Sequence, residues 1–295
     1  MSTYADIKLR DGNVMPKIAY GVGTALYRQD CVEQVKLALK TQYKHLDLAE
    51  VYETTHYVGQ ALKETGVDPK SLYITTKAGA GMKDVRKCLD EELAALGLDS
   101  VDCFLLHWPH DFRKPEFPSM EDAWRAMLKL RDEGKTRSVG VSNFRIRDLQ
   151  KLIDANLELP VINQIEYHPF LYETTEEVVQ FCAKHDIKLA AYSPLAPITK
   201  FSGGSFDAAL EKVTESVSER AGRKVASSQV LLRLAAQKGF VVVTTSNKEW
   251  RMKEQLEAGG LPELTEEEIE SLVRAAKPSP QRTFEEHMGG LDVEY

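Results

Sequence analysis

The sequence of 295 residues has few cysteines and no long apolar segment. Its four cysteines, Cys31, Cys88, Cys103 and Cys182, are widely separated and form no Cys-x-x-Cys pair. This spacing is more typical of reduced thiols in a reducing compartment than of a disulfide framework or a zinc site. No stretch approaches the ~18 apolar residues that a membrane span needs, and the first residues show no signal-peptide pattern. We therefore expect a cytoplasmic protein without a metal site or a membrane-spanning segment.

The chain also has fewer basic than acidic residues. The chain carries 38 Lys and Arg against 45 Asp and Glu, a formal net charge of -7, and both signs are spread along the sequence. Without a basic stripe, neither a nucleic-acid backbone nor an anionic membrane is an expected partner. We expect a small-molecule substrate instead, and a protein that is a monomer or a homodimer.

Short apolar runs alternate with amphipathic segments along most of the chain. Ile7 to Met15 alternates apolar and polar residues around Asp11-Gly12, which predicts an N-terminal β-hairpin over about residues 6–16. Strands are then predicted at 18–21, 43–48, 72–76, 101–106, 137–141, 161–165, 188–192 and 240–243. Helices are predicted at 32–39, 58–63, 82–96, 120–131, 146–153, 176–184, 227–236 and 265–273.

This alternation predicts an α/β fold, a (β/α)8 TIM barrel formed by one domain over residues 1–295, with a C-terminal tail over about 277–295. The alternative, an open sheet with a Gly-x-Gly-x-x-Gly nucleotide turn, has little support because the segment after Gly21 lacks the third glycine. Pro197 to Ala208 follows the seventh strand, and we interpret it as a mobile loop at the barrel mouth.

Four ionisable side chains are expected at the C-terminal ends of neighbouring strands. Asp47, Lys77 and His107 lie at the ends of the second, third and fourth strands, and Tyr52 lies five residues after Asp47. Such strand ends meet at one face of a barrel. Each residue alone has an ordinary structural role, as a turn cap, a loop surface residue, a strand end or a core ring. Their joint placement favours a shared chemistry.

That chemistry is the reduction of a carbonyl group by a hydride donor. Addition of hydride to the carbon leaves negative charge on the oxygen, which must be protonated. Tyr52 would donate this proton, with its pKa lowered from about 10 by Lys77, while Asp47 keeps the lysine charged and oriented. A neutral His107 would add a directional hydrogen bond to the same oxygen.

Six segments in order along the chain resemble motifs of the aldo-keto reductase family. They are Leu46-Asp-Leu-Ala-Glu-Val-Tyr52, Ile74-Thr-Thr-Lys77, Leu105-Leu-His-Trp-Pro109, Val139-Gly-Val-Ser-Asn-Phe144, Asn163-Gln-Ile-Glu-Tyr-His-Pro169 and Ala191-Tyr-Ser-Pro-Leu195. Together they cover almost the whole predicted barrel. The resemblance implies an NADP-dependent oxidoreductase in which Tyr52 is the proton donor, Lys77 and Asp47 tune it, and His107 orients the carbonyl.

The resemblance also implies a binding site for NADPH or NADP+. Ser142, Asn143 and Gln164 would hold the nicotinamide carboxamide, and Tyr192 would stack on the ring. The other implied cofactor contacts are Thr24 and Asp47, Ser193 and Leu195 near the pyrophosphate, Ser246, Asn247 and Arg251 at the 2'-phosphate, and Gln255 at the adenine. From the residues alone, a helix cap at Asn143 and core packing at Tyr192 remain alternatives.

Two departures from the family pattern concern specificity. Thr245 replaces a lysine that many members have at the 2'-phosphate, but donors at a nearby helix N-terminus still favour NADPH over NADH. The first strand exit, residues 23–25, lacks the tryptophan that many members place over the substrate, which predicts a roomier pocket lined by Tyr52, His107 and Trp108. In these features the chain resembles fungal-type NADPH-dependent reductases of α-keto amides and conjugated polyketones, with α-keto esters, diketones and ketolactones as expected substrates.

Two other classes of function compete with a reductase. One is a nicotinamide-binding regulatory or channel-associated subunit with little turnover, and the complete group of four ionisable residues argues against it. The other is a barrel hydrolase or metal enzyme, which would need histidine and carboxylate ligands clustered at strand ends. The seven histidines are scattered, and only His107 is well placed.

Overall fold

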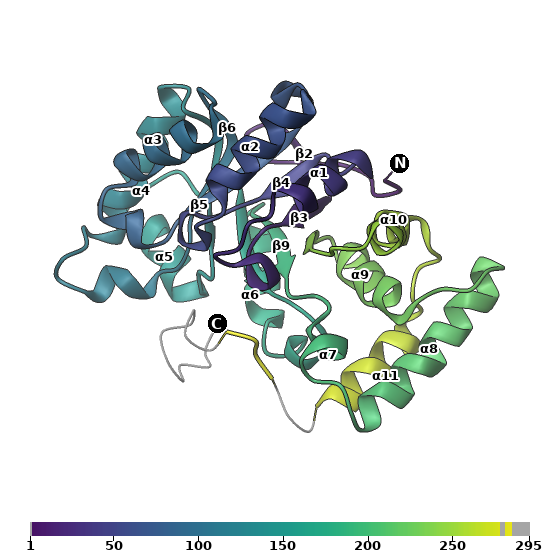
Figure 1. Cartoon of the computed structure of the whole chain (residues 1–295). Coiled ribbons are helices and arrows are strands. Elements are labelled where there is room, and N and C mark those ends of the chain that lie inside the picture. Colours follow the sequence, from purple (N-terminus) through teal and green to yellow (C-terminus); the bar gives the residue numbers. More distant parts are fainter. Residues whose placement is uncertain (1, 278–280, 285–295) are drawn as a thin grey trace.

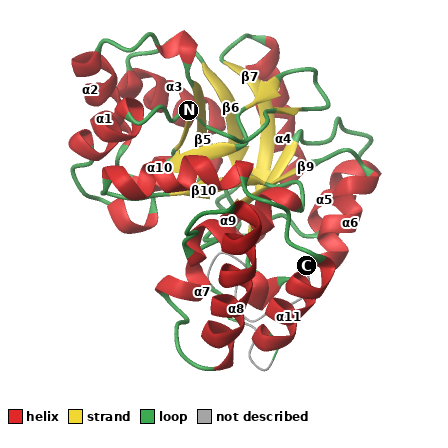
Figure 2. Ribbon diagram, turned by 90° about the vertical axis from the view of Figure 1, so that its right-hand side faces the viewer, coloured by secondary structure: helices red, strands yellow, loops and turns green. Residues whose placement is uncertain are grey.

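The computed structural model describes residues 2–277 and 281–284, and its centre is a closed barrel of eight parallel strands (Figures 1 and 2). The strands are β3 (Ile18–Gly21), β4 (His45–Asp47), β5 (Tyr73–Ala78), β6 (Val101–Leu106), β7 (Thr136–Ser142), β8 (Ile162–Glu166), β9 (Lys188–Tyr192) and β10 (Val241–Thr244). Neighbours follow chain order, and β10 pairs with β3 to close the ring. The predicted (β/α)8 TIM barrel is confirmed.

Helices cover the outside of the barrel (Figure 2). They are α1 (Val32–Lys40), α2 (Thr55–Thr65), α3 (Val85–Leu96), α4 (Met120–Asp132), α5 (Ile146–Asp154), α6 (Glu176–Lys184), α7 (Ala196–Thr199), α8 (Ser205–Ala221), α9 (Ser227–Gln237), α10 (Glu249–Glu257) and α11 (Glu266–Ala276). In α3 the buried side chains include Val85, Leu89, Leu93 and Leu96, whose spacing of three and four residues forms one apolar face of the predicted helix.

The N-terminal hairpin closes one end of the barrel. It consists of β1 (Ile7–Lys8) and β2 (Val14–Met15), paired antiparallel as predicted. Leu9 and Met15 are buried in one cluster with Tyr73 and Val241, which are the first residues of β5 and β10. The hairpin therefore covers the N-terminal face of the barrel, and the opposite face remains for the functional side chains.

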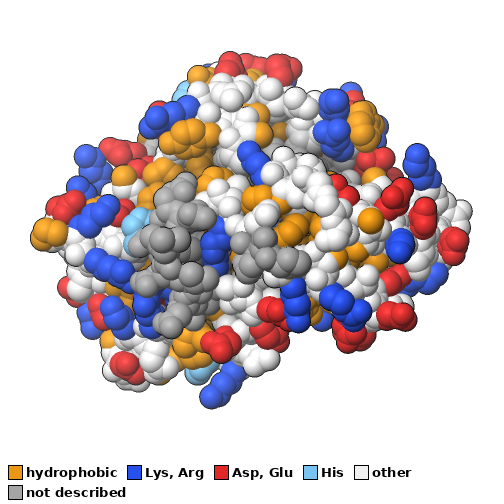
Figure 3. Space-filling model, turned by 90° about the horizontal axis from the view of Figure 1, so that it is seen from below, with side chains coloured by type: hydrophobic (Ala, Val, Ile, Leu, Met, Phe, Trp, Pro, Cys, Tyr) orange, Lys and Arg blue, Asp and Glu red, His pale blue; other side chains and the backbone are white. Residues whose placement is uncertain are grey.

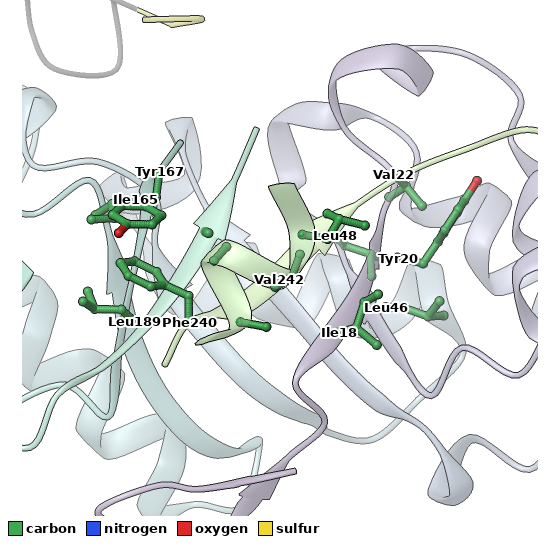
Figure 4. Close-up of a cluster of buried hydrophobic side chains, with 14 of the residues drawn as sticks. Ile18, Tyr20, Val22, Leu46, Leu48, Ile165, Tyr167, Leu189, Phe240 and Val242 are labelled. Atoms are coloured by element: carbon green, nitrogen blue, oxygen red, sulfur yellow. The ribbon is translucent and has the colours of Figure 1, made fainter. Parts of the chain in front are cut away.

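A second apolar cluster lies between the strands and the surrounding helices (Figure 4). Ile18 and Tyr20 of β3 and Leu46 of β4 belong to this cluster. At the other side the rings of Tyr167 and Phe240 stack with centroids 4.0 Å apart. This layer fixes the strands against the helices, and so fixes the positions of the strand ends.

The prediction of a mobile loop from Pro197 to Ala208 is wrong. Residues 196–199 form α7, and α8 begins at Ser205, because Phe206, Leu210, Val213 and Val217 form a buried stripe. This three- and four-residue spacing is a helix signal that the glycines at 203 and 204 obscured. A short connection at residues 200–204 is all that remains of the expected loop.

Most of the predicted C-terminal tail, 277–295, lies outside the described residues. In the described part of the chain, no helix is both long and apolar enough to cross a membrane. The same part contains no group of three or more His, Cys, Asp or Glu residues arranged to hold a metal ion. Basic and acidic side chains are interspersed on the face shown in Figure 3.

Candidate active site

The C-terminal ends of β4, β5 and β6 bring three of the four expected catalytic residues together. Asp47 is the last residue of β4, Lys77 lies one residue before the end of β5, and His107 directly follows β6. These strands are neighbours in the barrel, so their ends meet at one face. Tyr52 belongs to the short 3-10 helix η2 (Glu50–Tyr52), which follows β4.

Lys77 and Asp47 form a buried ion pair at this face. Their side chains are 0% and 3% exposed, and Nζ of Lys77 lies 2.5 Å from Oδ1 of Asp47. Nζ also donates to the backbone oxygen of Leu48 at 2.7 Å, and Nε2 of Gln164 donates to Oδ2 of Asp47 at 2.8 Å. Burial lowers the pKa of Lys77, but the Asp47 carboxylate and Tyr52 together outweigh burial and raise the pKa above its ordinary value. Lys77 is therefore a fixed positive charge.

The ring of Tyr52 lies beside this charge. Its centroid is 5.2 Å from Nζ of Lys77 and 5.7 Å from the ring centroid of His107, which it meets edge to face. Burial raises the pKa of Tyr52, and the Lys77 charge lowers it by less, so the pKa is above its ordinary value. The prediction that Lys77 lowers the pKa of Tyr52 below its ordinary value is wrong, because the effect of burial is larger than the effect of the lysine charge. Tyr52 thus keeps its proton at neutral pH, as a proton donor must.

Two glycines make room for aromatic rings at the site. A Cβ built on Gly23 would lie 2.8 Å from Cζ of Tyr52, so the tyrosine ring packs directly on the Gly23 backbone. A Cβ on Gly79 would lie 3.0 Å from the indole of Trp108. Trp108 stacks on His107 with ring centroids 4.4 Å apart. The structure therefore brings Tyr52, His107 and Trp108 together, as expected for the substrate-binding wall.

The residues expected at the nicotinamide form one hydrogen-bonded group on β7, β8 and β9. The Tyr192 hydroxyl donates to Oδ1 of Asn143 at 2.8 Å, and Nδ2 of Asn143 donates to Oγ of Ser142 at 3.1 Å. Oγ of Ser142 donates to the backbone oxygen of Gln164 at 2.8 Å. The N-cap of α5 is Arg145, so the helix-cap alternative for Asn143 is wrong. Tyr192 is only half-buried, which argues against the core-packing alternative.

Three of the expected cofactor residues have a left-handed backbone. The φ angle is 41° at Thr24, 60° at Asn143 and 54° at Ser193. In residues other than glycine such conformations cost free energy, on the order of 1 kcal/mol or more, and they concentrate at binding sites. Leu195 is half-buried two residues after Ser193, at the start of α7. These positions suit close approach of a ligand to the backbone.

Ser246, Asn247 and Arg251 gather at the N-terminus of α10. Oγ of Ser246 accepts a hydrogen bond from the backbone N–H of Lys248 at 3.1 Å, and Asn247 and Arg251 are exposed. The guanidinium carbon of Arg251 lies 4.9 Å from the ring centroid of Trp250. A helix N-terminus with an exposed amide and guanidinium suits a phosphate group.

Gln255, the residue expected at the adenine, lies inside the protein in this structure. The residue is 1% exposed, its Oε1 accepts a hydrogen bond from the Tyr43 hydroxyl at 2.8 Å, and its Nε2 donates to Oγ1 of Thr244 and to the backbone oxygen of Thr245. Both ends of the amide are occupied inside the protein. Through these hydrogen bonds Gln255 ties α10 to the end of β10.

Sequence reasoning missed the role of Glu50. Its Oε2 accepts hydrogen bonds from the backbone N–H groups of Gly79 and Gly81, at 2.8 and 3.1 Å. Glu50 precedes Tyr52 by two residues, and Gly79 follows Lys77 by two. The carboxylate thus joins the turn that carries the tyrosine to the strand exit that carries the lysine. The signal available in the sequence was an acidic residue inside the motif at 46–52.

The matching family model, described as "Aldo/keto reductase family", covers residues 17–277. The chain belongs to the aldo/keto reductase family. This reductase is 36% identical over 284 residues to the NAD/NADP-dependent indole-3-acetaldehyde reductase of Schizosaccharomyces pombe, across 94% of this chain and 97% of that protein. It is 34% identical over 278 residues to the NADPH-dependent alpha-keto amide reductase of Saccharomyces cerevisiae, across 90% and 88% of the two chains.

Solved structures agree with this assignment. A Bombyx mori aldo-keto reductase in complex with NADP superposes with a TM-score of 0.82 at 28% identity, over 96% of each chain. An aldo/keto reductase from Brucella melitensis gives a TM-score of 0.78 at 33% identity, over 92% of this chain and 99% of that one. The predicted family and the resemblance to yeast reductases are confirmed. This aldo/keto reductase is an oxidoreductase that uses a nicotinamide cofactor and acts on carbonyl groups.

Proposed function

We propose that this aldo/keto reductase reduces aldehydes and ketones to alcohols with NADPH, and that Tyr52 is the proton donor. The observation that carries the proposal is the buried Lys77–Asp47 pair with the Tyr52 ring beside it and His107 at the ring edge. A permanent charge fixed next to a protonated phenol is the arrangement that proton donation to a developing alkoxide requires.

In this mechanism the carbonyl oxygen of the substrate lies between the Tyr52 hydroxyl and the His107 ring. Both groups stabilise the negative charge that develops on oxygen, and Tyr52 then transfers its proton. The reduced nicotinamide, when bound, supplies the hydride. Lys77 stabilises the phenolate that remains on Tyr52, and Asp47 keeps the lysine in place.

The residues present fit a nicotinamide dinucleotide. Ser142, Asn143, Gln164 and Tyr192 would hold the nicotinamide, and Thr24, Ser193 and Leu195 would follow the backbone of the cofactor. Ser246, Asn247 and Arg251 would bind the 2'-phosphate, which favours NADPH over NADH. The S. pombe relative is named for both NAD and NADP, so we propose a preference for NADPH and not an absolute requirement.

For the substrate we propose small α-keto amides, α-keto esters, diketones or ketolactones. The first strand exit carries small residues at positions 23–25, and one relative is named as an alpha-keto amide reductase. The four cysteines are free and buried, which supports a reducing cytoplasmic setting. We also propose that the chain acts as one domain, as a monomer or a homodimer.

The test is NADPH and NADH consumption by the purified protein with a panel of aldehydes, α-keto esters, α-keto amides, diketones and ketolactones. We expect turnover with NADPH, slower turnover with NADH, and the highest kcat/KM on a dicarbonyl compound. Tight NADPH binding without turnover on any member of the panel would favour the regulatory alternative. Absence of binding for both nucleotides would contradict the proposal.

A further inference from the structure

A buried pair, Glu166 and His168, has no part in the proposed chemistry. Glu166 is the last residue of β8 and pairs in register with Tyr192, the last residue of β9. Both side chains of the pair are 0% exposed, and Nε2 of His168 lies 3.1 Å from Oε1 of Glu166. A buried carboxylate is costly unless it is paired and hydrogen-bonded. The buried carboxylate of Glu166 lies at the barrel face that holds the candidate active site, because Glu166 ends β8.

A third partner comes from the C-terminal segment 281–284. The backbone N–H of Thr283 donates to Oε1 of Glu166 at 2.7 Å, across 117 positions of sequence. Burial raises the pKa of Glu166, but the hydrogen bonds from His168 and Thr283 outweigh burial and hold the pKa below its ordinary value. Glu166 is therefore a charged acceptor at neutral pH, and hydrogen bonds to charged groups are stronger than those between neutral groups.

In the described part of the chain, the second polar atoms of Glu166 and His168 offer the segment no further hydrogen bond. Oε2 of Glu166 and Nδ1 of His168 are buried there without a hydrogen-bond partner. Oε1 of Glu166 thus carries both bonds, one from the histidine and one from the backbone of the segment. Loss of the Thr283 N–H would remove this hydrogen bond between the segment and β8.

The same segment reaches the nicotinamide wall. The ring centroids of Phe284 and Tyr192 lie 6.1 Å apart, and Tyr192 is the residue that donates to Asn143. Figure 1 draws residues 281–284 as a short yellow stretch that lies away from α11, the helix that precedes it in the chain. The segment is thus fastened at Thr283 to β8 and packed at Phe284 against the end of β9.

We propose that Glu166 and His168 form a latch that fastens residues 281–284 against Tyr192 and thereby slows release of the nicotinamide cofactor. Both are positioning residues, because they act through the segment and through Tyr192. The link to cofactor release rests on the proposed function, whereas the docking of the segment does not.

The first experiment compares Thr283→Pro with Thr283→Ala. Proline removes the N–H that Glu166 accepts, and alanine keeps it. Release of NADPH is followed by stopped-flow fluorescence after the loaded enzyme is mixed with excess NADP+. We expect release on the order of 10-fold faster for Thr283→Pro, the effect of losing one hydrogen bond to a charged group, and a wild-type rate for Thr283→Ala. Equal release rates for the two variants would overturn the role in cofactor retention.

The second experiment tests the docking without any cofactor. Trypsin can cut the Arg282–Thr283 bond, and the nearby Lys277 precedes a proline, which blocks cleavage there. Mass spectrometry then follows the loss of residues 283–295 in the wild type, Glu166→Gln and Glu166→Ala, after thermal melts have shown that each variant is folded. We expect cleavage about 10-fold faster in Glu166→Ala and an intermediate rate in Glu166→Gln, which keeps an oxygen acceptor.

Identical cleavage rates in the three proteins would overturn the latch. If the wild type does not bind NADPH, the proposed function has failed, but the cleavage rates still decide whether Glu166 holds the segment. The two failures are therefore distinguishable.

Discussion

Lys77 holds its ammonium group 5.2 Å from the ring centroid of Tyr52. The proton affinity of the phenol therefore depends on a charge that Asp47 fixes in position through a hydrogen bond of 2.5 Å. Gln164 donates to the other oxygen of Asp47, so the expected carboxamide site and the catalytic pair are joined by one carboxylate. A substitution at Lys77, Asp47 or Gln164 should therefore change the electrostatic environment of Tyr52.

Replacement of Lys77 by methionine should reduce both stability and turnover. The substitution leaves the Asp47 carboxylate buried and unpaired, which we expect to lower the free energy of unfolding by about 3–5 kcal/mol. Loss of the fixed charge should lower kcat by about 10²–10⁴, the usual contribution of a positioned acid. Urea denaturation and NADPH consumption measure the two effects.

The double variant Lys77→Met with Asp47→Asn is the control for that experiment. It removes both charges of the pair, so most of the lost stability should return. Turnover should remain low, because the charge beside Tyr52 is still missing. A double variant that regains turnover together with stability would show that Lys77 has only a structural role.

The reduction rate should be independent of pH around neutrality and should fall only at alkaline pH. Tyr52 must be protonated to donate, and a pKa raised by burial extends its protonated form above the ordinary value of about 10. The rate therefore has its full value when the pH is below the pKa of Tyr52, and it falls as the pH rises through that pKa. We expect this descending limb in kcat/KM of the wild type, and its absence from the residual rate of Tyr52→Phe. A wild-type limb centred below about pH 9 would contradict the raised pKa.

The barrel and the catalytic group could be predicted from sequence because their signals are local. Apolar runs mark the eight strands, and Asp47, Lys77 and His107 are placed by the strand ends that they follow. Amphipathic spacing likewise marks most of the helices. These features need no knowledge of which distant segments touch.

Features that depend on distant contacts could not be predicted in the same way. The pKa of Tyr52 is set by burial as well as by the lysine, and burial is a property of the folded site. The amide oxygen of Gln255 accepts a hydrogen bond from the Tyr43 hydroxyl, 212 positions away. The bond of Thr283 to Glu166 spans 117 positions and has no sequence pattern of its own.

Gly23→Ala should lower turnover by at least about 10-fold while leaving NADPH affinity nearly unchanged. The new Cβ would lie 2.8 Å from the Tyr52 ring, so the ring must leave its present position beside Lys77 and His107. A displacement of about 1 Å at a reacting group can cost up to about 100-fold in rate. Ala94→Gly, a change of one methyl group at an exposed residue of α3 outside the site, is the control and should turn over as wild type.

Arg251→Gln should weaken NADPH binding by about 10- to 100-fold and leave NADH binding unchanged. The guanidinium at the start of α10 is the charge that we assign to the 2'-phosphate, and hydrogen bonds between charged groups contribute about 1.5–3 kcal/mol. Fluorescence titration gives both dissociation constants. Lys253→Gln removes a positive charge from the same helix, where Lys253 pairs with Glu249, and should change neither constant. Equal weakening of NADPH and NADH binding would contradict the assignment.

The most direct test of the central claim is single-turnover hydride transfer in Tyr52→Phe loaded with NADPH. The carbonyl substrate is the best one found in the panel, and loss of NADPH absorbance is followed after rapid mixing. If Tyr52 is the proton donor, NADPH affinity stays within about 3-fold of the wild type while the transfer rate falls by about 10²–10⁴. A variant that binds NADPH normally and transfers hydride at the wild-type rate would show that Tyr52 is not the donor.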